Sequence, residues 1–294
     1  MTLDRFRLAV AQPRVETEPD GEVNVARATE LVARAGDAGA SLVLFPEGYP
    51  GPVLRRPFDL YNAGPAMAAA AAEHGIAVCW SRIELCGDGV RRLVVYVVDS
   101  SGTELLRSPR AHPAAIHPKE TGGAWIAPGE GLVSVQVGGV EVGVIVCSEL
   151  WVPEPTRVLA LRGSELVLSP AGGGFTSLTE NWQLIARARA IENNMYVALT
   201  NNLWGEERGA AMIAGPEHVV VSSGFEELIV GTLDLERVRW LRDHDDSIVE
   251  PKPFASIPGL TRFRRPELYG DLTAPATDAY DFWTDRSQEI LANR

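Results

Sequence analysis

Apolar residues along the chain recur with two periods, one typical of strands and one typical of helices. Short apolar runs, rich in Val and Ile, predict strands at residues 6–12, 41–45, 76–81, 140–146, 166–169, 196–200 and 227–234. Apolar residues at helical spacing predict helices at residues 23–40, 64–74, 156–162 and 178–194. Residues 92–107 and 209–222 have the pattern of hairpins with polar turns.

The order of these elements predicts a layered α/β protein. Strands linked by helices alternate with antiparallel pairs, and the pattern occurs approximately twice, which indicates two similar halves. From about residue 250 onward prolines are frequent and periodic apolar segments are few. We therefore expect one domain over residues 1–250 and a C-terminal arm over residues 251–294 that packs on the body or on a partner subunit.

Composition narrows the class further. The chain of 294 residues is 46% hydrophobic and 22% charged, as is ordinary for a soluble globular protein. Its formal net charge of −12 argues against a general affinity for nucleic acid or for anionic membranes. No signal-peptide pattern and no apolar stretch of about 18 residues is present. Cys79, Cys86 and Cys147 are odd in number and lack metal-type spacing, so we expect a reduced, cytoplasmic protein.

One cysteine lies where a buried strand ends. The apolar run 140–146 stops at Cys147, and polar Ser148 and Glu149 follow before a helix that begins after Pro153. A side chain at such a junction can be held rigidly with backbone N–H groups close by, as a nucleophile requires. The competing interpretation is a cysteine that only fills space in the core, which is the commoner role of this residue.

A carboxylate occupies the corresponding place on another strand. Strand 41–45 is followed by Pro46 and Glu47, and open α/β sheets bind ligands beyond the C-terminal ends of their strands. Glu47 could take the proton of a thiol if burial raises its pKa, and a strand-end cap is the alternative. The irregular loop 108–130 contains Arg110 and Lys119, either of which could stabilise developing negative charge.

Several short segments form a set with a fixed order and spacing. They are Phe45-Pro46-Glu47, the strand leading into Cys147-Ser148-Glu149, Pro153-Glu154 with Arg157, strand 166–170 and the helical stretch 187–193. Over roughly residues 5–240 this set resembles the nitrilase superfamily of carbon–nitrogen hydrolases, and residues 264–269 are similar to a C-terminal segment of many bacterial members. The resemblance implies a four-layer α-β-β-α sandwich with an extended C-terminal arm, assembly into homodimers or larger homo-oligomers, and no metal or organic cofactor.

The resemblance also implies roles for particular residues. Cys147 resembles the family's nucleophile and Glu47 its general base. Glu120 resembles the second, supporting glutamate, because it precedes a family-like loop end at residues 125–129. The sequence departs from the family at the lysine, whose place is taken by Arg110.

Arginine at this position leaves three interpretations open. Arginine keeps the positive charge but in practice cannot lose its proton, and its planar fork is bulkier than an ammonium group. Arg110 could stabilise the tetrahedral intermediate as a fixed cation, for an unusual substrate. Alternatively, Lys119 could replace it, or the site could bind a ligand without hydrolysing it.

Four residues beside these turns are candidates for substrate binding. The backbone N–H of Ser148 could hold an oxyanion, and Gly172 lies in a glycine-rich turn that lets the backbone come close to a substrate. The rings of Tyr49 and Trp151 could shape an acyl pocket, although buried packing is an equal alternative.

Together these features predict a hydrolase of a small-molecule amide or N-carbamoyl group that acts through a thioester on Cys147. Nitrilase activity is less favoured, because that branch of the family usually has Trp where Ser148 stands. Two alternatives remain: a catalytically silent member that binds a small ligand or serves as a scaffold, and an acyltransferase that uses the same cysteine.

Overall fold

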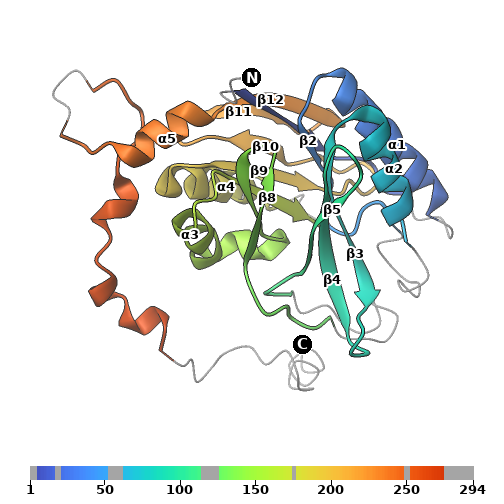
Figure 1. Cartoon of the computed structure of the whole chain (residues 1–294), viewed down its shortest axis with the longest axis horizontal. Coiled ribbons are helices and arrows are strands. Elements are labelled where there is room, and N and C mark those ends of the chain that lie inside the picture. The colour runs from blue at the N-terminus through green and yellow to red at the C-terminus, as the bar shows by residue number, and fades with distance from the viewer. Residues whose placement is uncertain are drawn as a thin grey trace.

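Two six-stranded sheets packed face to face form the centre of the protein in a computed structural model (Figure 1). The structure describes residues 5–16, 21–51, 62–113, 126–173, 177–247 and 252–274. The first sheet, in the order β12-β1-β2-β3-β4-β5, contains β1 (Arg5–Ala11), β2 (Leu42–Leu44), β3 (Ala77–Leu85), β4 (Arg91–Val98), β5 (Glu104–Pro109) and β12 (Leu228–Asp234). The second sheet, in the order β11-β10-β9-β8-β7-β6, contains β6 (Val133–Val137), β7 (Val140–Val144), β8 (Leu166–Ala171), β9 (Tyr196–Asn201), β10 (Ala211–Ala214) and β11 (Val219–Ser223).

The two sheets have the same internal plan, as the repeated sequence pattern predicts. Strands β1, β2 and β3 are mutually parallel in the first sheet, and β7, β8 and β9 are parallel in the second. Antiparallel strands complete each sheet on both sides of its parallel centre. The C-terminal ends of parallel strands lie at one edge of their sheet, so each half offers one such edge for a site.

Helices cover the outer face of each sheet. Helices α1 (Glu22–Asp37) and α2 (Gly64–His74) lie on the first sheet, and α3 (Pro153–Leu161) and α4 (Thr179–Asn193) lie on the second (Figure 1). Buried residues form three clusters, one between the two sheets and one between each sheet and its helices. This is the predicted four-layer α-β-β-α sandwich, folded as a single domain.

The structure adds two elements that the sequence pattern alone did not lead us to expect. Strand β6 has a strict alternation of Val133, Val135 and Val137, which is a usable strand signal in retrospect. Helix α5 (Leu235–Asp243) buries Leu235, Val238 and Leu241 at helical spacing. The side chain of Asp234 caps this helix by accepting a hydrogen bond of 2.9 Å from the Arg237 backbone N–H.

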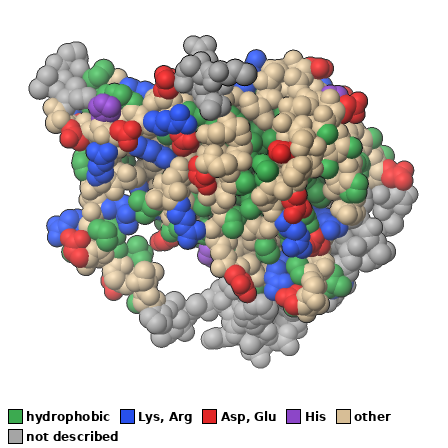
Figure 2. Space-filling model, in the orientation of Figure 1, with side chains coloured by type: hydrophobic (Ala, Val, Ile, Leu, Met, Phe, Trp, Pro, Cys, Tyr) green, Lys and Arg blue, Asp and Glu red, His purple; other side chains and the backbone are tan. Residues whose placement is uncertain are grey.

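The described part of the C-terminal segment, residues 252–274, runs along one side of the body as an extended chain with short 3₁₀ turns (Figure 1). In a space-filling view an opening remains between this arm and the body (Figure 2). Among the described helices, none combines the length and the apolar character needed to cross a membrane.

Candidate active site

Four strands from the parallel centres of the two sheets end close together at the candidate site. Glu47 follows β2, Cys147 follows β7, Gly172 follows β8 and Asn202 follows β9. The Glu47 backbone N–H donates to the Ala171 carbonyl oxygen at 3.2 Å, which ties the end of β2 to the end of β8 in the other sheet. The Asn202 side-chain amide donates to the Glu47 carbonyl oxygen at 2.7 Å. The turn that carries Glu47 is therefore fixed from the second sheet.

Cys147 opens a 3₁₀ turn, Cys147–Trp151, that leads into α3. Its backbone has a φ of 53°, in the left-handed region that non-glycine residues rarely occupy. Such a conformation costs on the order of 1 kcal/mol or more and is kept where the surrounding structure determines it, often at functional sites. Cys147 as a whole residue is half-buried, at the junction of β7 and the turn. The strain singles out Cys147 from the other two cysteines.

Arg110 extends between the glutamate and the cysteine turn. It follows β5 directly, and only 2% of its side chain is exposed. Its Nη1 donates to Glu47 Oε1 at 2.8 Å, and its Nη2 donates to Ser148 Oγ at 2.5 Å. No hydrogen-bond partner for Nε is found among the described residues. A buried guanidinium with one ion pair and free donor capacity is suited to holding further negative charge.

The surroundings set the protonation of these groups. Burial raises the pKa of the Cys147 thiol to about 12, and the Glu47 carboxylate adds to the increase. Arg110 and a backbone hydrogen bond from Gly172 oppose it. For Arg110, burial works against the charged form, but the charges of Glu47, Cys147 and Glu149 leave its pKa above the ordinary value. Near neutral pH the site therefore holds a protonated thiol, which needs a base, beside a permanent cation.

Gly172 lies against both groups. A Cβ atom at this position would meet Glu47 Oε2 at 2.9 Å, closer than a real Cβ contact, so only glycine leaves the carboxylate where it is. Its carbonyl oxygen accepts a hydrogen bond of 3.2 Å from Trp204 Nε1. The glycine-rich turn thus brings its backbone up to the glutamate and the thiol.

Sequence reasoning missed the contact between Glu149 and His112. Glu149 is buried; its Oε2 accepts from the Val146 backbone N–H at 2.6 Å, and its Oε1 accepts from the His112 backbone N–H at 2.7 Å. The His112 ring lies 3.1 Å from the same Oε1, and this hydrogen bond raises the pKa of His112. Glu149 therefore turns inward to these donors.

Helix α4 also stabilises the turn that begins at Cys147. Arg189 Nε donates to the Leu150 carbonyl oxygen and Nη2 donates to the Trp151 carbonyl oxygen, both at 3.0 Å. Arg189 also forms an ion pair with Glu192, at 3.1 Å. The helical motif that carries these residues therefore stabilises the end of the cysteine turn.

The remaining predicted site residues differ in their surroundings. Tyr49 is fully buried, stacks on Phe45 and donates a hydrogen bond of 3.1 Å to the Asn24 carbonyl oxygen, as the packing alternative predicts; its contact with substrate stays a prediction. The Trp151 ring packs edge-on against Trp182 of α4, with ring centroids 5.5 Å apart. Glu120 and Lys119 lie outside the described residues.

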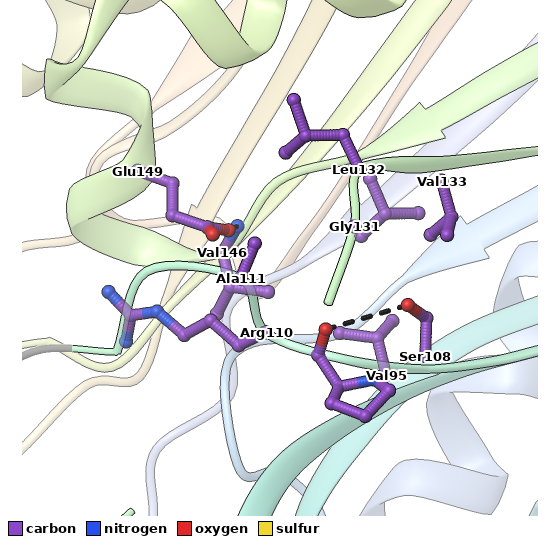
Figure 3. Close-up of a pocket in the computed structure, with 11 residues that line it drawn as sticks. Val95, Ser108, Arg110, Ala111, Gly131, Leu132, Val133, Val146 and Glu149 are labelled. Carbon is purple, nitrogen blue, oxygen red and sulfur yellow. Dashed lines mark hydrogen bonds between the residues drawn. The ribbon is translucent and has the colours of Figure 1, made fainter. Parts of the chain in front are cut away.

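A small cavity lies behind the Arg110 backbone, between the two sheets (Figure 3). Its volume of about 10 Å³ suits one water molecule and no substrate. The Arg110 side chain points away from Ser108 and Val95 (Figure 3). Its guanidinium group donates to Glu47 instead of lining this cavity's far wall. Over the described segments, no cluster of three or more His, Cys, Asp and Glu side chains is arranged to hold a metal ion.

Two packed sheets with a cysteine, a glutamate and a cation meeting at their strand ends define a hydrolase of the nitrilase type. The chain belongs to the carbon–nitrogen hydrolase family, because residues 7–243 match the model of that family.

Relatives agree with this assignment. A hydrolase of Mycobacterium tuberculosis H37Rv is 32% identical over 268 residues, covering 81% of this chain and 92% of the relative. An omega-amidase of Xenopus tropicalis is 26% identical over 284 residues, covering 90% and 97%. On the basis of its family, its relatives and similar solved structures, the chain is an amidase-like hydrolase.

Solved structures give the same picture. An amidase from Nesterenkonia sp. has a TM-score of 0.70 at 25% identity, covering 91% of this chain and 96% of that one. A mutant of the Nesterenkonia sp. AN1 amidase, with a TM-score of 0.66 at 26% identity and coverage of 80% and 95%, carries acrylamide on its active-site cysteine. A carbon–nitrogen hydrolase of Helicobacter pylori G27 has a TM-score of 0.75 at 20% identity, covering 92% and 99%, and shows the fold alone.

Proposed function

We propose that this protein hydrolyses the carbon–nitrogen bond of a small amide or N-carbamoyl compound through a thioester on Cys147. The observation that carries the proposal is the bridge formed by Arg110, which donates to Glu47 at 2.8 Å and to the cysteine turn at 2.5 Å. An omega-amidase among the relatives supports amide chemistry, and the Michael addition of acrylamide at the active-site cysteine of a similar amidase supports a reactive cysteine.

In the proposed first half-reaction, Glu47 takes the proton of the Cys147 thiol as the sulfur attacks the carbonyl carbon. Arg110 and the Ser148 backbone N–H stabilise the resulting oxyanion. Glu47 then gives the proton to the departing amine, the carbon–nitrogen bond breaks and the thioester remains. The raised pKa of Cys147 supports this role for Glu47, because a thiol with a pKa of about 12 needs a base to attack near neutral pH.

In the second half-reaction, water attacks the thioester while Glu47 takes its proton. The carbon–sulfur bond breaks, the thiol recovers its proton from Glu47, and the acid is released. Glu120 keeps its proposed role as the supporting glutamate, and the Gly172 backbone is proposed to contact the substrate. Trp151 keeps a proposed place at the edge of the acyl pocket.

Arg110 fills the lysine position in this proposal as a fixed cation. Its charge is permanent, so it stabilises the intermediate without exchanging a proton. We expect Lys119→Ala to leave amide turnover unchanged and Arg110→Gln to lower it by roughly 100-fold or more. Loss of turnover in Lys119→Ala, with retention in Arg110→Gln, would transfer the role to Lys119.

A panel of small aliphatic amides and N-carbamoyl amines tests the function. Ammonia or amine release is measured for the wild type, and mass spectrometry after rapid acid quenching detects the acyl group. We expect turnover of at least one compound and an acyl mass on the peptide containing Cys147. Turnover without any Cys147 adduct, and equal turnover in Cys147→Ala, would contradict the thioester.

The same experiment separates the alternatives. Added hydroxylamine competes with water for a thioester, so formation of hydroxamate faster than acid would favour acyl transfer to an amine. A silent member would bind amides, as detected by a shift in melting temperature, but would release no ammonia and form no adduct.

We further propose that the protein is a homodimer or larger homo-oligomer and that residues 251–294 contribute to the contact. The described arm exposes Phe263, Leu268 and Leu272, with 64% of each leucine accessible. Beside it, a cavity of about 290 Å³ separates the arm from α3 and α4, with Arg157 and Tyr269 in its wall. A second copy would cover this apolar surface. Sedimentation of Leu268→Glu should show a shift toward monomer; a monomeric wild type would contradict the proposal.

A reducing compartment such as the cytoplasm is the proposed location. All three cysteines are free thiols in the structure, which is typical of proteins from reducing compartments. Fractionation of cells that produce a tagged protein tests this location directly.

A further inference from the structure

Two consecutive residues of the cysteine turn hold the segment that carries Arg110. Ser148 Oγ accepts the hydrogen bond from Arg110 Nη2 at 2.5 Å, and Glu149 Oε1 accepts the hydrogen bond from the His112 backbone N–H at 2.7 Å. The other oxygen of Glu149 accepts from Val146, the residue before the nucleophile, at 2.6 Å. The loop with the cation is therefore attached at two points to the turn with the thiol.

The guanidinium group makes one of these attachments possible. Its two terminal nitrogens lie in one plane and reach two acceptors at once, so one contacts Glu47 and the other contacts Ser148. An ammonium group is a single point charge and cannot match this spacing with the same rigidity.

We infer that the side chains of Ser148 and Glu149 fix the Arg110 charge beside Cys147, and that the Ser148 hydroxyl acts only through Arg110. Ser148 holds the guanidinium end, and Glu149 holds the backbone on which Arg110 is mounted. The inference rests on the proposed function for its kinetic test, but the position of the charge can be measured without turnover.

The electrostatic contact between the two groups supports this arrangement. The Arg110 charge lowers the pKa of Cys147, and the Cys147 charge raises the pKa of Arg110, so the two are close enough to influence each other. With Ser148 removed, Arg110 retains Glu47 as its partner, and we expect the guanidinium to swing toward Glu47 and away from the thiol.

The first experiment compares two alkylating reagents of similar size, iodoacetate and iodoacetamide, on Cys147 in the full-length protein. Access to the thiol affects both reagents alike, so the ratio of their rate constants reports the local charge. In Ser148→Ala we expect the rate constant for iodoacetate to fall by roughly 5-fold or more relative to that for iodoacetamide. The ratio of the two should then approach the ratio in Arg110→Gln. Ser148→Thr keeps the hydroxyl and should keep the wild-type ratio.

The second experiment is a double-mutant cycle on amide hydrolysis. Ser148→Ala alone should lower kcat by roughly 10- to 100-fold, as expected for losing a hydrogen bond to a charged group, with little change in KM. In the Arg110→Lys background the same substitution should have almost no effect, because Lys does not span both acceptors.

Glu149→Gln tests the second attachment. The glutamine amide can accept from only one of the two backbone donors, so the loop or the strand end loses its partner. We expect the alkylation ratio to shift in the same direction as in Ser148→Ala. Matched controls are Ser134→Ala, on edge strand β6, and Glu165→Gln, where the carboxylate pairs with Arg239 on the body.

Additive effects of Ser148→Ala and Arg110→Lys, or an unchanged reagent ratio in both Ser148→Ala and Glu149→Gln, would overturn the inference. Failure of the proposed function gives a different result. In that case the wild type hydrolyses no amide, while the reagent ratios still show whether Ser148 and Glu149 hold the charge beside Cys147.

Discussion

Cys79 and Cys147 are chemically the same residue in two differently built regions. Cys79 lies in the middle of β3, fully buried among the apolar residues between the sheets, and burial alone raises its pKa. Cys147 lies past the end of β7, where burial also raises the pKa but Glu47, Arg110 and the Gly172 backbone act on the thiol as well. Burial by itself makes a thiol inert. What distinguishes Cys147 is a carboxylate, a cation and a backbone donor that act on the thiol.

The sharpest test of this contrast exchanges each cysteine for alanine. We expect Cys147→Ala to lose at least about 1000-fold in amide turnover, because no other group can form the thioester. Cys79→Ala should keep its turnover and lose about 1 kcal/mol of unfolding free energy from the small cavity left between the sheets. Turnover assays and urea denaturation measure the two effects. The reverse pattern would show that Cys147 is the packing residue.

Removing Glu47, the proposed base, should lower turnover without making the Cys147 thiol less reactive. In Glu47→Gln we expect turnover to fall by roughly 100- to 10,000-fold, the range of a general base. Alkylation of Cys147 by iodoacetamide at neutral pH should not slow in parallel, because loss of the Glu47 charge lowers the pKa of the Cys147 thiol. Unchanged amide turnover in Glu47→Gln would contradict the role of Glu47 as the base.

Displacing the Glu47 carboxylate without removing it should lower amide turnover less. Gly172→Ala places a Cβ 2.9 Å from Glu47 Oε2, so the carboxylate must move while the fold does not. We expect turnover to fall by roughly 10- to 100-fold through this misplacement, with a melting temperature close to that of the wild type. Gly87→Ala, where an added Cβ meets nothing within 4 Å, is the matched control. Equal turnover in both variants would contradict the close approach.

The smallest expected effect is on thermal stability and concerns the contact between Glu149 and His112. The Glu149 carboxylate raises the pKa of His112 above its ordinary value of 6.5, so the protonated ring stabilises the folded state. This contribution is complete below about pH 6.5 and is lost as the pH rises through the raised pKa. The melting temperature of the wild type should exceed that of His112→Ala most at low pH, and the difference should shrink above pH 6.5. A difference that grows with pH would contradict the ion pair.

The fold was accessible from the sequence because local patterns determine it. The helix at residues 64–74 has the same bounds in the structure, and the strands before Glu47 and Cys147 end within two residues of the expected positions. Apolar periodicity and proline or glycine at the ends are short-range signals, and they survive folding when the buried face they describe is the face that packs. Strand β6 and helix α5 carry the same kinds of signal in shorter segments.

Within the candidate site, the sequence by itself determined which residue types stand at which strand ends: Glu47, Cys147 and the glycine-rich turn. Only the tertiary structure decided their partners. It placed Arg110 between Glu47 and Ser148, turned Glu149 toward His112 and sank Tyr49 into the core. These contacts join segments tens of residues apart and depend on side-chain direction within a few ångströms. A hydrophobic period specifies which face of a strand is buried, but not which polar groups meet where strands of two sheets end.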